Sequence, residues 1–192
     1  VIVGAYNYDN GQINEGRAFL YFGSASGLVA SGWTAESDQE AALFGFAVGA
    51  AGDVNGDGYS DVIVGAYNYD NGQTNEGRAY VYLGSPSGLA ATPVWTAESN
   101  QANAYFGFSV ATAGDVNGDG YSDVIVGAWS YDRGFADEGA AFLYLGSASG
   151  PAASPAWSAW SDQAGASEYG FDVATAGDVN GDGYSDGQGG AP

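Results

Sequence analysis

The chain contains no cysteine, methionine, histidine or lysine, and its three basic residues are all arginine. Without cysteine no disulfide framework can form, and without histidine or cysteine a bound metal would have only oxygen ligands. The usual nucleophile and base pairs also need histidine, cysteine or lysine. Carboxylates such as Glu36, Asp38 and Glu98 could support glycoside hydrolysis, but they occur in polar loops or at strand ends with no sign of burial. The sequence therefore predicts that the protein is not an enzyme.

Acidic residues dominate the charge of the chain. Twenty-three Asp and Glu residues face three arginines, and the formal net charge is −20. No basic patch can form, which excludes nucleic acids and anionic membranes as expected partners. No apolar run is long enough to span a bilayer, so membrane insertion is not expected. The absence of a signal peptide and an initiator methionine indicates a mature product or a piece of a longer protein.

The nonapeptide DVNGDGYSD occurs three times, at residues 53–61, 115–123 and 178–186. The regular spacing indicates one supersecondary unit that is repeated. In the first copy Asp53, Asn55 and Asp57 alternate, so their side-chain oxygens can converge as the backbone turns at Gly58. Asp61 closes the pattern. Such an arrangement of oxygens predicts a cation-binding loop.

Positions 1, 3, 5, 7 and 9 of the nonapeptide carry the oxygen pattern of an EF-hand calcium loop, with Gly at position 6. The side chains supply four oxygens, and a backbone carbonyl supplies the oxygen at position 7. The loop is shorter than an EF-hand loop, because Val64 and not Glu stands at the twelfth position. We therefore expect about three Ca²⁺ per chain, bound by Asp53, Asn55, Asp57, Tyr59, Asp61, Asp115, Asn117, Asp119, Tyr121, Asp123, Asp178, Asn180, Asp182, Tyr184 and Asp186. Weak calcium sites of this kind suit an extracellular or cell-surface protein.

Residues 44–99 show the repeated unit most clearly. Segments 44–53, 62–67, 78–85 and 93–99 are strand-like, and Gly, Asn, Asp and Pro turns separate them. No segment has helical periodicity, so the sequence predicts an all-β fold of four-stranded antiparallel sheets. One such sheet cannot bury both of its faces, so the repeats must pack on one another. Four strands per unit favour the blades of a β-propeller over a linear solenoid.

The two ends of the chain read as two halves of one repeat. Residues 169–186 supply a first strand and its loop, residues 1–36 supply strands two to four, and copies 44–99 and 106–161 are whole. Residues 1–186 thus hold three blades, and residues 187–192 are expected to be a linker or an added tail. The strand edges at 1–3 and 169–177 are expected to lack partners, and such edges associate readily. Because propellers usually have four to eight blades, we expect a head-to-tail homodimer that closes a six-bladed ring.

The string FGFSVATAGDVNGDGYSDVIVGA at 106–128 resembles the FG-GAP repeat of integrin alpha-subunit propellers and their bacterial relatives. Phe106-Gly107 matches the FG element and Gly127-Ala128 the start of GAP, with the calcium loop between them. The third copy has Tyr169-Gly170 in place of Phe-Gly. Dockerins and EF-hands share the core of the loop, but they need a helix after it. The segment VIVGA at 62–66 is a poor start for a helix, so we discard them.

The resemblance implies that the calcium loops join strands 1 and 2 of each blade on the lower face of the propeller. Ligands would meet the upper face, formed here by segments 68–77, 130–139, 99–105 and 161–168. The implied function is a calcium-stabilised structural or adhesion module that binds a protein partner.

A carbohydrate-binding propeller is the alternative function. Aromatic pairs that recur after the second strand would stack on sugars, although such rings more often fill the space between blades. These pairs are Tyr6/Tyr8, Tyr67/Tyr69 and Trp129/Tyr131. The recurring Trp33, Trp95 and Trp157 are interpreted as structural. Arg17 and Arg78 each follow a Glu by two residues, and we expect interstrand ion pairs there.

Overall fold

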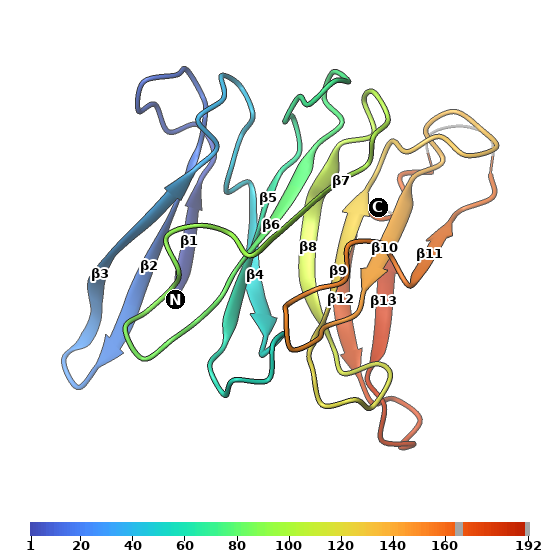
Figure 1. Ribbon diagram of the computed structural model, residues 1–192. Helices are drawn as coiled ribbons and strands as arrows, with labels where there is room; N and C mark the ends of the chain where they lie inside the picture. Colours follow the sequence, from blue (N-terminus) through green and yellow to red (C-terminus); the bar gives the residue numbers. More distant parts are fainter. Residues whose placement is uncertain (164–166, 191–192) are drawn as a thin grey trace.

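The structure, a computed structural model, describes residues 1–163 and 167–190. The strands form four antiparallel sheets that follow one another along the chain and stack face to face (Figure 1). The described residues contain no helix, and therefore no helix that could span a membrane. The first sheet contains β1 (Ile2–Ala5), β2 (Arg17–Ser24) and β3 (Gly27–Glu36); the second β4 (Ala47–Gly52), β5 (Asp61–Ala66), β6 (Arg78–Tyr82) and β7 (Trp95–Glu98); the third β8 (Phe106–Gly114), β9 (Asp123–Ala128), β10 (Ala140–Tyr144) and β11 (Trp157–Trp160); and the fourth β12 (Asp172–Gly177) and β13 (Asp186–Gly190).

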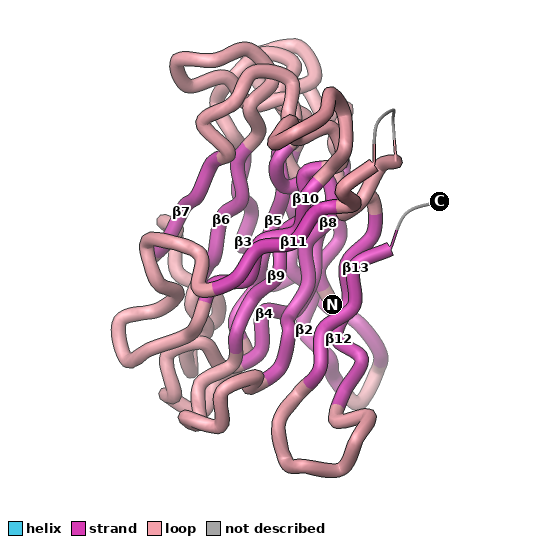
Figure 2. Tube along the Cα trace, turned by 90° about the vertical axis from the view of Figure 1, so that its right-hand side faces the viewer, coloured by secondary structure: helices cyan, strands magenta, loops and turns pink. Residues whose placement is uncertain are grey.

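The second and third sheets are complete four-stranded meanders, in which each strand pairs with the next one along the chain. This confirms the all-β fold and the four-stranded antiparallel sheets expected for 44–99 and 106–161. The first strands of successive sheets are neighbours, since β8 contacts both β4 and β12. Most loops gather at the two ends of the strands (Figure 2). This arrangement is that of neighbouring propeller blades.

The sequence of each middle strand is apolar on both faces because a sheet covers each of them. All six residues of β5 are buried. In β6, Tyr82 meets Trp33 of the first sheet, with ring centroids 5.2 Å apart. Val81 of the same strand faces the other way, into a cluster with Val124 of the third sheet. The alternation of residue size along β6 therefore reflects two different neighbours and not a core face and a solvent face.

The outer sheets are incomplete within the described residues. There β1 pairs only with β2, and the first sheet has the strands expected as two to four of a blade. The fourth sheet pairs β12 with β13. The expectation that 187–192 form a linker or tail, and that strand 169–177 lacks a partner, is therefore wrong for residues 187–190. They pair with β12 because ladder hydrogen bonds use backbone groups, which glycine also has. Residues 191 and 192 lie outside the described residues.

Candidate metal centre

The three nonapeptides occupy the same place in three successive sheets. Each connects the first strand of a sheet to the second: β4 to β5, β8 to β9, and β12 to β13. The three loops lie together along the lower edge in Figure 1. The order of strand, loop and strand that the sequence predicts therefore places every candidate ligand at one end of the stack.

Backbone N–H groups hold the acidic side chains inside each loop. The carboxylate of Asp53 accepts hydrogen bonds from the N–H groups of Asp57, at 3.0 Å, and of Gly58, at 2.8 Å. Asp57 in turn accepts one from Tyr59, at 2.9 Å. Gly58 has a φ of 88°, which favours glycine at the bend. The other two loops repeat the contact between Asp53 and Gly58: Asp115 accepts a hydrogen bond from the N–H of Gly120, and Asp178 accepts one from Gly183, each at 2.8 Å.

Asp61 ties the first loop to the rest of its sheet. The side chain is completely buried, and its two oxygens accept hydrogen bonds from Val54 at 2.8 Å and from Gly84, beyond β6, at 2.7 Å. Burial raises the pKa of Asp61, and the negative charges of Asp57 and Asp53 raise it further, against the lowering effect of the two N–H groups. In the second loop Asp123 accepts from the equivalent N–H groups of Val116 and Gly146, and its pKa is raised for the same reasons.

The third loop is more open. Asp186 accepts a hydrogen bond from Val179 at 3.0 Å, but among the described residues it has no donor that corresponds to Gly84. The pKa of the exposed Asp178 is lowered, chiefly by the hydrogen bond from the N–H of Gly183. The sequence predicts that the N-terminal segment supplies the strand that follows Asp186. In the structure Asp186 instead begins β13, so residues 186–190 anchor it.

The donor set of these loops fits a hard divalent cation. All the candidate side-chain ligands offer oxygen, which Ca²⁺ prefers. Across residues 1–163 and 167–190, no group of three or more acidic side chains gathers around one point, since the carboxylates turn toward backbone N–H groups. In the first loop each of the two carboxylate oxygens of Asp53 accepts one hydrogen bond and retains a lone pair, whereas Oδ1 of Asp115 and Oδ1 of Asp178 each accept two. A cation would also offset the repulsion that Asp53 and Asp57 exert on Asp61.

The loops also join neighbouring sheets, a feature that sequence reasoning missed. The carbonyl oxygen of Asp53 accepts a hydrogen bond from the N–H of Ser122 at 2.9 Å, and that of Val54 accepts one from Ser147 at 3.1 Å. The third and fourth sheets repeat the first contact between Asp115 and Ser185, at 2.9 Å. The serine at the eighth position of every nonapeptide was the available signal. A cation in one loop would therefore hold the joint between two blades.

The aromatic pairs pack within and between the sheets. Tyr67 lies edge-on to Phe46 and Phe108, with centroid distances of 4.6 and 5.2 Å. The guanidinium of Arg78 covers the ring of Tyr69 at 4.1 Å. Rings engaged in this way are not free platforms for sugars, which favours the structural interpretation of the pairs.

Two of the candidate carboxylates outside the loops, Glu36 and Glu98, form ion pairs. Arg78 pairs with Glu98 across β6 and β7, and Arg17 with Glu36 across β2 and β3, at 2.5 Å. The ion pairs are interstrand, as expected, but the partners are Glu36 and Glu98. The glutamates two residues before each arginine, Glu15 and Glu76, are completely buried.

Comparison with known proteins agrees with this architecture. The FG-GAP repeat family matches residues 44–82 and 106–144. Integrin alpha pat-2 of Caenorhabditis briggsae is 37% identical over 122 residues, which are 62% of this chain and 10% of that protein. Integrin alpha-7 of Homo sapiens is 33% identical over 152 residues, 74% and 12% of the two chains. Integrin alpha-IIb of Mus musculus is 36% identical over 156 residues, which are 78% of this chain and 15% of that protein. The chain thus spans about a tenth to a seventh of the length of these relatives.

Stacked four-stranded sheets, each with an acidic loop between its first two strands, define a repeat protein built from β-propeller blades. The chain carries FG-GAP repeats at residues 44–82 and 106–144 and is similar to integrin alpha subunits.

Proposed function

We propose that the chain is a calcium-stabilised β-propeller module for adhesion, in which the loops hold Ca²⁺ and the opposite face binds a protein. The observation that carries this proposal is the position of the acidic loops. Each joins the first and second strands of a sheet, and the first two also hydrogen-bond to the next sheet through backbone carbonyls.

Calcium has a mechanical role in this proposal. Without a cation, three carboxylates share one short loop, and Asp61 is buried there against the charges of Asp57 and Asp53. A divalent ion offsets this repulsion and fixes the turn. Because Asp53 and Val54 also accept hydrogen bonds from Ser122 and Ser147, a rigid loop stiffens the contact between two blades. With about three loops filled, the stack would behave as one body.

The protein partner is assigned to the end of the strands opposite the calcium loops. Segments 68–77, 99–105, 130–139 and 161–168 lie there, although residues 164–166 fall outside the described residues. Similarity to integrin alpha subunits supports an adhesion role at an extracellular or cell surface, where free calcium is plentiful. The proposal assigns no catalytic step to any residue.

Calorimetric titration with CaCl₂ tests the metal sites, and Asp57→Asn is the informative variant. The asparagine keeps an oxygen for the N–H of Tyr59 but removes one ligand charge. We expect about three sites in the wild type, with one site weakened by about tenfold or more in the variant. Asp38→Asn, an exposed change outside the loops, is the matched control and should bind as the wild type does. No binding at millimolar calcium would refute the proposal.

A further inference from the structure

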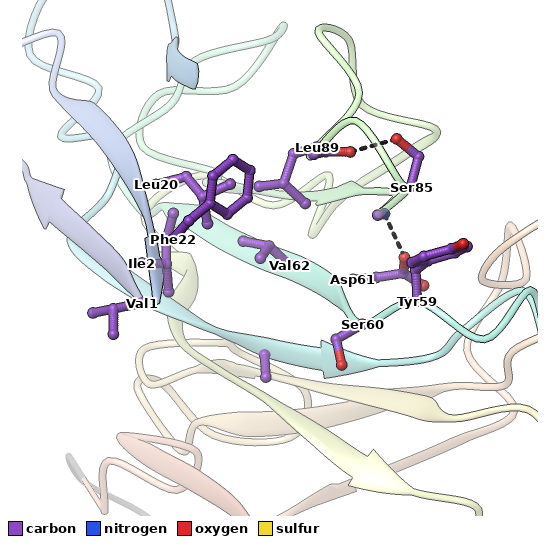
Figure 3. A pocket seen from close by; sticks show the side chains of 13 residues that line it. Val1, Ile2, Leu20, Phe22, Tyr59, Ser60, Asp61, Val62, Ser85 and Leu89 are labelled. Atoms are coloured by element: carbon purple, nitrogen blue, oxygen red, sulfur yellow. Dashed lines mark hydrogen bonds between the residues drawn. The ribbon is translucent and has the colours of Figure 1, made fainter. Parts of the chain in front are cut away.

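A hollow of about 370 Å³ lies between the first and second sheets, at the end where the calcium loops are found. Figure 3 shows Ile2, Leu20 and Phe22 on one side of it and Ser60, Val62 and Ser85 on the other. The lining is largely apolar. In a complete blade, the first strand and its loop would occupy this place, and the first sheet lacks both within the described residues.

The corresponding place between the second and third sheets is filled. Ala51 and Val54, from the end of β4 and its loop, are completely buried there, in a cluster with Val124 and Tyr144. The N–H groups of Ser122 and Ser147 donate to the carbonyls of Asp53 and Val54. The end of a first strand and its acidic loop therefore fill this joint, and the hollow is open at the equivalent place.

Each end of the stack carries what the other end lacks. At the hollow, the residues equivalent to Ser122 and Ser147 are Ser60 and Ser85, and their N–H groups donate to no acceptor among the described residues. At the other end, the residues equivalent to Ala51 and Val54 are Ala176 and Val179. Val179 is 70% exposed, whereas Val54 is completely buried.

The strand edges are complementary in the same way. The alignment of the repeats places Val3 at the position of Val64, yet Val3 is 44% exposed and Val64 is buried. Beside β12, the place that β5 takes beside β4 is taken by β13, whose last four residues are Gly187, Gln188 and two further glycines. Glycine weakens a strand, whereas the β-branched residues of β1 favour one. β1 is therefore the better partner for β12.

We propose that two copies of this 192-residue chain associate head to tail by exchanging these elements. β1 of one copy replaces β13 beside β12 of the other. The hairpin 177–186 of that other copy then enters the hollow of the first copy. Its Val179 packs on Val62 of the first copy, and the carbonyls of its Asp178 and Val179 accept hydrogen bonds from the N–H groups of Ser60 and Ser85 of the first copy. The exchange is reciprocal and gives a ring of six blades. It rests on the contacts between sheets and not on the proposed adhesion role.

Light scattering coupled to size-exclusion chromatography in calcium tests the association. The wild type should show twice the chain mass of 19.4 kDa. Val179→Gln should return it to the mass of one chain, because it changes a side chain that is exposed in the single chain but buried in the pair. Ile13→Gln, at a position 61% exposed at the opposite end of the strands, is the matched control and should keep the mass of two chains. A single-chain mass for the wild type, or a pair that Val179→Gln leaves intact, would overturn the proposal.

A second variant tests the exchange of strands. A Cβ on Gly187 would lie 3.9 Å from the Ile125 side chain, an ordinary contact, so Gly187→Val should strengthen β13. If β1 must displace β13, this variant weakens the pair by several-fold in dissociation constant. An unchanged or tighter constant would show that β13 stays in place and would contradict the exchange.

Discussion

Gly65 in β5 and Gly107 in β8 lie backbone against backbone across two neighbouring sheets. A Cβ on Gly65 would overlap the carbonyl oxygen of Gly107. The same contact joins Gly4 to Gly45 and Gly127 to Gly170. One glycine of each pair comes from the FG element of one sheet, and the other from the Gly-Ala that ends β1, β5 or β9 in the preceding sheet. These two glycines are therefore where successive blades touch most closely.

Substitution Gly65→Ala should lower the free energy of unfolding by about 3 kcal/mol, because backbone atoms of two sheets would have to separate. Gly134→Ala is the control, since nothing lies within 4 Å of an added Cβ at that loop position. Urea unfolding of both variants checks the prediction. Equal stabilities for the two would mean that this glycine contact does not set the spacing of the blades.

The tryptophans on the last strand of each blade should differ in their contribution to stability. Trp95 is buried and donates from Nε1 to the carbonyl of Ala152 in the third sheet at 2.8 Å, whereas Trp157 is 49% exposed. Trp95→Phe leaves that carbonyl without its donor and should cost about 1–3 kcal/mol. In the single chain, obtained with the additional change Val179→Gln, Trp157→Phe should cost no more than about 0.5 kcal/mol. Thermal unfolding of the pair measures the difference, and a larger loss for Trp157→Phe would contradict the assigned contacts.

The buried Glu76 should make stability depend on pH. Oε1 accepts a hydrogen bond from Asn71 at 2.5 Å, while Oε2 has no partner. Burial raises the pKa of Glu76 above its ordinary value of 4.5. The ionised side chain therefore costs stability above the raised pKa, and this cost disappears as the pH falls through that pKa toward 4.5.

Glu76→Gln should accordingly raise the melting temperature at pH 7, with a gain over the wild type that shrinks as the pH is lowered. Melting curves between pH 7 and pH 4.5 measure it. The surface variant Glu40→Gln controls for the loss of one negative charge. A gain that grows on acidification would have the wrong sign for a buried acid with a raised pKa.

The strands of the two complete sheets could be predicted from local sequence because their patterns are strong. The all-apolar VIVGA runs became the fully buried β5 and β9, and RAYVY became β6 with both faces covered. The loop positions followed from the identical nonapeptides. In each case the signal lay within a few residues of the element that it specified.

Contacts between distant segments could not be predicted. Nothing local to Glu15 indicates that Arg17 turns instead to Glu36, 19 residues away on the neighbouring strand. The glycine-rich residues 187–190 have low strand propensity, but the open backbone edge of β12 gives them a partner. The joint between Asp53 and Ser122 is likewise a property of the stacked sheets, since 69 residues separate the pair.

The most direct test of the account is the melting temperature of the chain in millimolar calcium and in EDTA. Sites with dissociation constants of roughly 10⁻⁴–10⁻³ M, filled at about 10 mM Ca²⁺, stabilise the folded state by about 1–3 kcal/mol each. Three filled loops should therefore raise the midpoint by at least about 5 °C, and Asp57→Asn should reduce that rise while Asp38→Asn leaves it intact. An identical midpoint in calcium and in EDTA would contradict the claim that these loops bind calcium to hold the blades together.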